Sequence, residues 1–308
     1  MNSASRVLSM KKTFKKEKGI WLLAVPIILW VVVFAYYPMY GLLLSFFHYV
    51  PGKSIFECEW AGLFYFAQFF NSPDFLQVLR NTLVISFLNL LIGFPAPIIL
   101  ALMLNEVRRK WFKKFVQTIS YLPYFISWVV AASLIFTFLS SDGILTKLLL
   151  SFNIIDKPIN FLSEGKYFWA ILTSANIWKG IGWSSIIYLS AMAGINNQLY
   201  EAAEVDGCSR LKQIWHITLP GIRPTIILLL ILSIGSILNA GFEQQLLIGS
   251  PQTREYWDVI DTYAYRYGIK LGRYSYGTAV GLFKSSIGLG LVFFTNWLSK
   301  KKFDMSIM

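Results

Sequence analysis

The sequence contains few of the residues on which soluble enzymes depend. Charged residues make up 14% of its 308 residues, whereas soluble domains carry about 25%. It has only two histidines and two cysteines, and neither a phosphate-binding G-x-x-x-x-G-K-[ST] run nor a zinc-binding H-E-x-x-H run occurs. We therefore expect no catalytic residue and no metal site in this chain, and an enzymatic function is disfavoured.

Long apolar runs are what the sequence has instead. Hydrophobic residues make up 56% of the chain, and the mean hydropathy is +0.54. Backbone groups in lipid must be satisfied within their own segment, and no alternating ten-residue pattern of a membrane barrel occurs, so these runs should be helices. The fold class is predicted to be an all-α polytopic membrane protein. Six runs reach the roughly 20 residues that a helix needs to cross a bilayer: 20–47, 81–104, 118–140, 167–193, 225–247 and 277–298.

Basic residues are distributed unevenly between the two sides of this predicted topology. The net charge is +12, and seventeen Lys and Arg fall on the side of the termini against nine on the other. By the positive-inside rule both termini are cytoplasmic. The basic excess is thus interpreted as a topology signal, not as a nucleic-acid-binding surface. Cys58 and Cys208 then lie on opposite faces and cannot pair.

Four regions are expected along the chain. A basic cytoplasmic tail (1–19) precedes the first transmembrane helix and an aromatic outer loop (20–78). A five-helix permease core (79–299) and a short cytoplasmic tail (300–308) follow. The aromatic loop is expected either to lie in the membrane interface or to serve as a lid or docking surface. Two prolines within Gly93–Pro97 should bend the second span, for a cavity or simply for packing.

One polar segment, EAAEVDGCSRLKQIWHITLP at 201–220, interrupts the apolar runs on the cytoplasmic side. Its composition predicts a helix, a turn at Gly207, a second helix capped by Ser209 and a stop at Pro220. Such a hairpin could lie on the inner leaflet with its apolar stripe in the lipid. The carboxylates of Glu201 and Glu204 share one face of the first helix and should avoid an anionic membrane surface, so a basic groove on a partner protein suits them better.

The spacing of this hairpin resembles the EAA loop of ABC-importer permeases. Further segments are similar to permease subunits of carbohydrate-uptake ABC importers, in particular the LplB-like polysaccharide and oligosaccharide branch, and the resemblance covers residues 15–300. The large outer domain and extra N-terminal helices of maltose-type subunits are missing here. The segments that carry the resemblance are Glu201-Ala202-Ala203 with Gly207, Ile217 and Leu219-Pro220; Leu104-Asn105-Glu106; 121–128 (YLPYFISW); Asp261-Thr262-Tyr263; and Gly281-Leu282-Phe283.

The resemblance implies a MetI-like permease fold and a set of partners. A second, homologous permease would pair with this chain, two copies of an ATPase carrying ATP and Mg would dock beneath it, and an extracellular solute-binding lipoprotein would deliver a sugar. The protein would lie in the bacterial plasma membrane and bind no cofactor itself. The residues that would couple it to the ATPase are Glu201, Ala202, Ala203, Glu204, Asp206, Gly207, Ile217, Leu219 and Pro220.

Polar and aromatic residues within the predicted spans are candidates for the sugar path, because sugars stack on aromatic faces and need hydrogen-bond partners for their hydroxyls. Alternatively, the tryptophans anchor the interface and the amides join helices. An intramembrane lysine costs about 2.5–3.5 kcal/mol, so Lys179 and Lys284 should face protein or water, with Glu243 as a counter-ion for either. The two lysines would suit an acidic sugar, or an ion pair explains them equally well. The candidates are Asn176, Trp178, Lys179, Trp183, Asn239, Glu243, Gln244, Gln245 and Lys284.

Three other functions stay open on the sequence. A permease of the same architecture could carry another solute, such as an amino acid or a peptide. An ion-coupled secondary transporter would work without partners. A membrane-embedded enzyme would need a cluster of carboxylates or metal ligands, which the sequence does not offer.

Overall fold

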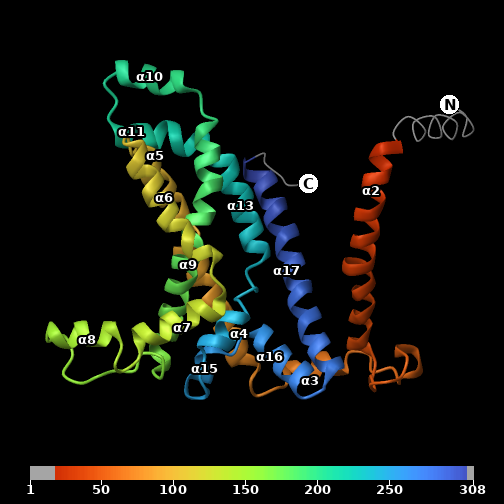
Figure 1. Ribbon diagram of the computed structural model, residues 1–308. Coiled ribbons are helices and arrows are strands. Elements are labelled where there is room, and N and C mark those ends of the chain that lie inside the picture. Colours follow the sequence, from red (N-terminus) through yellow and green to blue (C-terminus); the bar gives the residue numbers. More distant parts are fainter. Residues whose placement is uncertain (1–17, 304–308) are drawn as a thin grey trace, which may run out of the picture.

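The computed structural model describes residues 18–303, and every regular element in this part of the chain is a helix. One isolated bridge joins Phe47 to Trp60. The all-α prediction is therefore confirmed, while most of the two predicted tails, 1–17 and 304–308, lies outside the described residues. Figure 1 shows a bundle of long helices with α10 projecting from one end, here called the hairpin end, and α3, α8, α15 and α16 at the opposite end, here called the loop end.

Four of the six predicted spans form where the apolar runs place them. Pro95 and Pro97 do not break the second span: they fall in the first turn of a helix, where a missing N–H costs nothing, and a π-helical turn at Asn89–Gly93 precedes them. The four spans are Lys18–Val31 (α2), continued by a π-helical turn (Val32–Tyr36) and a 3-10 helix (Tyr37–Phe46); Phe75–Leu88 (α4) with Pro95–Glu106 (α5); Gly165–Ala193 (α9); and Tyr274–Phe303 (α17).

The third predicted span, 118–140, is wrong as a single crossing. The backbone is extended at Ile126 and Ser127, and the Ser127 side chain accepts a hydrogen bond from the backbone N–H of Val130, which starts a new helix. The first helix packs along α9, whereas the next two extend away from the bundle at the loop end (Figure 1). These helices are Lys110–Phe125 (α6), Trp128–Leu139 (α7) and Ile144–Ser151 (α8).

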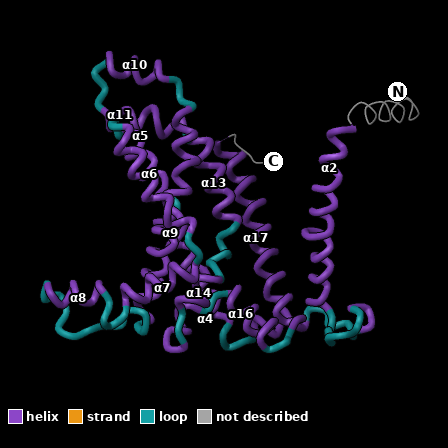
Figure 2. The backbone as a smooth tube through the Cα atoms, in the orientation of Figure 1, coloured by secondary structure: helices purple, strands orange, loops and turns teal. Residues whose placement is uncertain are grey.

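The fifth predicted span, 225–247, is also interrupted. Pro224 lies in the first turn of α13 (Arg223–Gly235), as predicted. This helix ends at Gly235, and a loop leads from it to α14 (Glu243–Ile248), as Figure 2 shows. Gly241 has a φ of +100° in this loop, a conformation open mainly to glycine. Judged by length and apolar composition, four segments of the described chain could span a membrane: 19–46, 75–106, 128–151 and 274–301; a fifth is added when the pair bent by 62° between 210–221 and 223–235 counts as one. Helix α9 is long enough but is not among them, so the number six is not confirmed.

An aromatic core holds the loop end together. Phe69, in the short helix Phe64–Phe70 (α3), is 1% exposed and packs with Tyr263 and Tyr276. The predicted aromatic outer loop is thus packed against α17 in part, although Phe56 and Trp60 stay largely exposed. The other elements of this end are a 3-10 turn at Pro251–Thr253, Arg254–Trp257 (α15), Ile260–Tyr265 (α16) and a π-helical turn at Arg266–Lys270.

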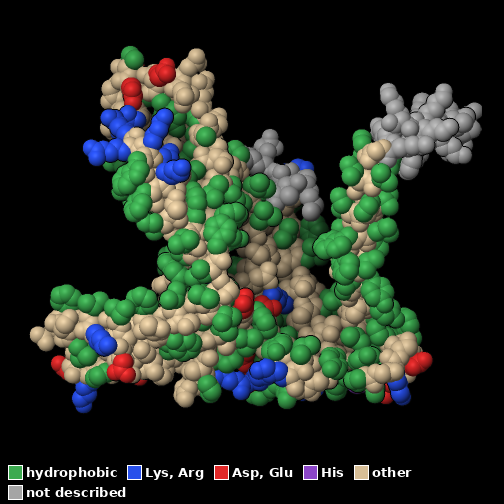
Figure 3. Space-filling model, viewed as in Figure 1, with side chains coloured by type: hydrophobic (Ala, Val, Ile, Leu, Met, Phe, Trp, Pro, Cys, Tyr) green, Lys and Arg blue, Asp and Glu red, His purple; other side chains and the backbone are tan. Residues whose placement is uncertain are grey.

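Many apolar side chains lie on the visible surface of the long helices (Figure 3), as expected for helices that face lipid or other membrane subunits. Figure 1 shows α2 standing apart from the bundle, and none of its most apolar window is buried. Charged side chains gather at the two ends. The bundle is thus built as a membrane protein with a projecting polar hairpin.

Candidate functional site

The first candidate site is the polar hairpin, whose first helix is Asn197–Val205 (α10). The Asn196 side chain caps this helix by accepting a 3.0 Å hydrogen bond from the N–H of Gln198. Gly207 has a φ of +71°, and the N–H groups of residues 207 and 208 bond the carbonyls of 204 and 203. This is a Schellman ending, so the predicted glycine turn is confirmed.

The second half of the hairpin differs from the prediction in two places. Ser209 precedes the helix Arg210–Gln213 (α11), but its side chain makes no capping hydrogen bond. Pro220 does not end the segment, because the helix continues through a π-helical turn (Ile214–Thr218) into Leu219–Gly221 (α12). Proline is accommodated there at the first turn of a new α-helical stretch. The chain bends only after Gly221, at the 62° angle to α13.

Most of the predicted coupling residues lie on the exposed surface of this hairpin. Val205, at its tip, is 88% exposed. Glu204 forms a 2.9 Å ion pair with Arg210 across the turn. Glu201, Ala202, Glu204, Asp206, Gly207 and Pro220 are exposed, whereas Ala203, Ile217 and Leu219 are half-buried.

The base of the hairpin is fixed to the bundle. The hydroxyl groups of Tyr200 and Thr218 are 2.9 Å apart and join the two halves. Ile222, at the bend, is fully buried with Ala101, Tyr188 and Met192 in a cluster here called the base cluster. The foot of the hairpin is therefore close-packed against α5 and α9.

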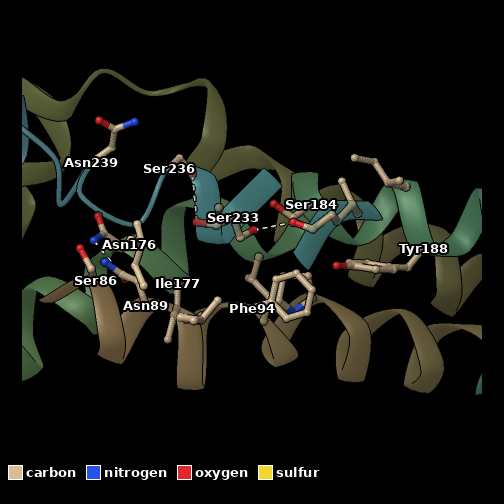
Figure 4. Close-up of a pocket in the computed structure, with 18 residues that line it drawn as sticks. Ser86, Asn89, Phe94, Asn176, Ile177, Ser184, Tyr188, Ser233, Ser236 and Asn239 are labelled. Carbon is tan, nitrogen blue, oxygen red and sulfur yellow. Dashed lines mark hydrogen bonds between the residues drawn. The ribbon is translucent and has the colours of Figure 1, made fainter. Parts of the chain in front are cut away.

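The second candidate site is a cavity of about 370 Å³ between the helices of the bundle, lined by apolar side chains and by eight polar ones. Figure 4 shows its walls: the α4–α5 span, α9 and α13, with the loop after α13 at one end. The side chains of Asn89 and Asn176 meet there at 3.4 Å, and the Oγ atom of Ser86 is buried without a hydrogen-bond partner. The polar residues that line it are Ser86, Asn89, Asn176, Ser184, Tyr188, Ser233, Ser236 and Asn239.

Three of the nine predicted path residues lie in or beside this cavity. Asn176 and Asn239 line it, and the Nε2 atom of Gln244 lies 3.4 Å from the Oδ1 atom of Asn176. These side chains come from α9, from the loop after α13 and from α14. The cavity offers amide and hydroxyl groups that can donate and accept hydrogen bonds, which is the chemistry that neutral sugar hydroxyls require.

Three other predicted path residues do not line this cavity. Trp178 lines a separate apolar groove with Leu134 and Phe138. Trp183 stacks on Tyr124 at 4.7 Å and stays 43% exposed. Gln245 is fully buried and donates to the carbonyl of Ala240 at 2.5 Å, so it holds the loop.

The expectation that Glu243 would be the counter-ion of an intramembrane lysine is wrong. The Nζ atom of Lys284 lies 2.6 Å from the Oδ2 atom of Asp261. The Nζ atom of Lys179 donates instead to the carbonyl of Tyr124 at 2.9 Å. Glu243 is exposed and forms no ion pair within residues 18–303.

Sequence reasoning missed six polar residues of the cavity. Serines on apolar helices commonly bond the carbonyl one turn back, as Ser233 does with Leu229 at 2.8 Å, so their presence in a span predicts no cavity. Asn89 was the stronger signal, since an amide in the middle of a span needs a partner. The six are Ser86, Asn89, Ser184, Tyr188, Ser233 and Ser236.

Tyr188 connects the two candidate sites. It lines the cavity and also belongs to the base cluster beneath the hairpin. Within the described residues no group of three or more His, Cys, Asp or Glu side chains is placed to hold a metal ion. The wall of the cavity is thus packed, through Tyr188, against the foot of the exposed hairpin.

Comparisons with known proteins point in the same direction. The family model described as binding-protein-dependent transport system inner membrane component matches residues 93–304. Protein LplB of Bacillus subtilis is 45% identical over 300 residues, covering 97% of this chain and 94% of the relative. The polygalacturonan/rhamnogalacturonan transport system permease protein YteP of the same organism is 47% identical, covering 93% of this chain and 89% of the relative.

A solved structure is similar along nearly the whole chain. It is that of a bacterial ABC transporter involved in the import of the acidic polysaccharide alginate, solved also in complex with an alginate pentasaccharide-bound periplasmic protein. The matched subunit is 42% identical with a TM-score of 0.88, covering 96% of this chain and 99% of that chain. The predicted resemblance is confirmed.

Proposed function

Because the chain belongs to the family of binding-protein-dependent transport system inner membrane components, we propose that it translocates an oligosaccharide as the transmembrane subunit of an ATP-driven importer. The chain is a transport component, and a separate subunit hydrolyses ATP. A sugar cargo is supported by relatives named for polygalacturonan/rhamnogalacturonan and alginate transport. It is supported equally by the amide and hydroxyl lining of the cavity.

The observation that carries this proposal is the packing of Tyr188, which forms both a wall of the cavity and part of the base cluster. An ATPase carrying ATP and Mg docks on the exposed hairpin, with the carboxylate of Glu201 in a basic groove of that partner. When the ATPase pair closes, it moves the hairpin, and the base cluster passes the displacement to α5 and α9. The cavity then opens alternately to either side by rigid-body motion of helices.

The remaining partners follow from the same proposal. The hairpin end faces the cytoplasm of a bacterium, and both chain termini lie on that side of the plasma membrane. Exposed basic side chains near the start of α6 gather there with the hairpin (Figure 3). A second permease pairs with this chain, two ATPase copies bind beneath the pair, and an extracellular solute-binding lipoprotein docks at the loop end.

The hairpin assignment is tested by co-purification of the ATPase with variants of the permease. Glu201→Arg reverses the docking charge, and Gly207→Pro is incompatible with a φ of +71° because proline fixes φ near −65°. Both should abolish ATPase docking and uptake while membrane insertion persists. Lys147→Glu, an exposed charge reversal at the loop end, is the control and should keep the ATPase bound. ATPase retention by both hairpin variants would refute the coupling role.

The class of transporter is tested separately in liposomes that contain only this chain. A sodium or proton gradient should drive no sugar uptake, because the motor is a separate subunit. Gradient-driven uptake by the chain alone would instead identify a secondary transporter.

A further inference from the structure

The two lysines within the membrane helices differ in how their charges are compensated. Lys284 on α17 is 14% exposed and is neutralised by Asp261, with Nζ 2.6 Å from Oδ2. Lys179, at the midpoint of the 29-residue helix α9, makes no ion pair within the described part of the chain. Only Lys179 therefore adds a positive charge in the middle of the bundle that the described residues leave unneutralised.

Lys179 is held in place by neutral groups. Its ammonium group donates to the carbonyls of Tyr124 at 2.9 Å and Pro123 at 3.4 Å, which the break after α6 leaves without helical partners. It also lies 5.5 Å from the ring centres of both Tyr124 and Trp128. Carbonyl dipoles and aromatic faces stabilise a cation without removing its charge, so the ammonium group can still attract an anion.

The surroundings of Lys179 suit a sugar. Lys179 and Trp183 lie three and seven residues after Asn176 on α9. At these spacings both side chains border the helix face on which Asn176 lines the cavity. Trp183 stacks on Tyr124, which also contacts the Lys179 ammonium group, and Trp183 and Phe125 are 43% and 69% exposed. Aromatic faces for sugar rings, amides for hydroxyl groups and one uncompensated cation thus lie along one side of α9.

We propose that Lys179 is a carboxylate-recognition residue of the translocation path and that the cargo is an acidic oligosaccharide built from uronic acids. This inference rests on the proposed transport function and names the substrate class of the same path. The ammonium group forms a charge-assisted hydrogen bond with a sugar carboxylate as the chain passes Trp183. The alginate transporter and the polygalacturonan permease, both similar to this chain, are named for polysaccharides that carry carboxylates.

Glu243 is the observation that competes with this inference. Its exposed carboxylate also lacks an ion pair within residues 18–303. The adjacent Gln244 contacts Asn176, so Glu243 lies close to the cavity and would repel an acidic sugar. Neutralising Lys179 should therefore weaken uptake of an acidic sugar, whereas neutralising Glu243 should not. Variants of these two residues form a matched pair.

The experiment is ATP-driven uptake by the importer reconstituted in proteoliposomes with its second permease, ATPase and binding protein. The probes are oligogalacturonate tetrasaccharide and its carboxyl-reduced neutral counterpart, each supplied with saturating binding protein. Lys179→Gln keeps a donor for the two carbonyls but removes the charge, and Lys179→Arg keeps the charge. We expect Lys179→Gln to lower kcat/KM for the acidic sugar about tenfold or more, Lys179→Arg to restore most of it, and Glu243→Gln to leave it equal or higher.

Four results would overturn the inference: acidic-sugar uptake by Lys179→Gln within twofold of the unmodified protein, an equal loss for both sugars, a loss on neutralising Glu243, or wild-type uptake of the neutral sugar alone. An equal loss would mean that Lys179 only supports the end of α6. If the wild-type importer takes up neither sugar with its binding protein, the proposed oligosaccharide function itself fails.

Discussion

Charged side chains are held differently at the two ends of the molecule. At the loop end, Asp258 is 1% exposed, contacts Arg266, and accepts a hydrogen bond from Thr262 at 2.7 Å. Burial alone would lower the pKa of the Arg266 guanidinium, but the carboxylate of Asp258 outweighs it and raises that pKa. At the hairpin end, Glu204 forms an ion pair with Arg210, and both side chains are 53% exposed.

The charged groups of the loop end are thus fixed by contacts within the chain, whereas those of the hairpin are available to a partner. We call the loop end the frame and the hairpin (201–220) the handle. The amide of Asn81 on α4 donates to the carbonyls of Glu255 at 2.8 Å and Asp258 at 3.0 Å, so the loop end is tied to the bundle by buried groups. The carboxylates of Glu201 and Asp206 on the hairpin remain in solvent. A part that serves as a lever needs a rigid base, while the surface that meets a partner must keep its polar groups available.

The largest effect is expected from Asp258→Ala. Removing this carboxylate leaves the largely buried Arg266 with only the longer ion pair to Asp74 at 3.7 Å, which should lower the free energy of unfolding by up to about 3–5 kcal/mol. The measurement is thermal unfolding of the purified permease in one detergent. Asp206→Ala, an exposed carboxylate of the hairpin, is the matched control and should change stability by less than about 0.5 kcal/mol. If both variants lost the same free energy of unfolding, the loop end would not be held more firmly than the hairpin.

A second effect should separate two glycines on α9. A Cβ atom at Gly182 would lie 2.1 Å from the backbone oxygen of Ser120, so α6 and α9 touch there, whereas nothing lies within 4 Å of a Cβ at Gly180. Gly182→Ala should destabilise the protein by about 1–3 kcal/mol through overpacking. Gly180→Ala should be neutral or slightly stabilising, because alanine favours helix. Equal unfolding midpoints for the two variants would show that α6 can move away freely.

The sequence predicts where the chain crosses the membrane better than where it turns. Apolar length located both α9 (predicted 167–193, observed Gly165–Ala193) and α17 (predicted 277–298, observed Tyr274–Phe303), because hydropathy measures whether a segment can be buried in lipid. It did not identify the breaks at Ile126–Ser127 or in the loop that contains Gly241, because a broken helix and a straight one have the same composition. Those breaks depend on which groups satisfy the freed backbone, such as Lys179 at the end of α6.

The candidate site was predictable only at residues whose type has few possible roles within a membrane span. Asn176 and Asn239 were identified because amides within a span can bond sugar hydroxyls, whereas Asn89, which carries the same signal, was missed. A tryptophan within a span can line a cavity or pack against other apolar side chains, and the structure places Trp178 in an apolar groove. The pairing of Lys284 with Asp261, 23 residues away, could not be foreseen because it depends on how α16 folds back against α17.

The smallest effect on stability is expected from Glu204→Ala, which removes the exposed ion pair with Arg210. Water and salt screen such a pair, so the free energy of unfolding should fall by less than about 1 kcal/mol, and the loss should shrink as salt is added. Arg210→Ala is the reciprocal variant and should behave alike. If Glu204 instead contacts the ATPase, its loss will weaken co-purification of that partner more than Arg210→Ala does, because only the carboxylate faces a basic groove. A stability loss as large as that of Asp258→Ala would mean that the hairpin is part of the frame, and the lever would then have to lie elsewhere.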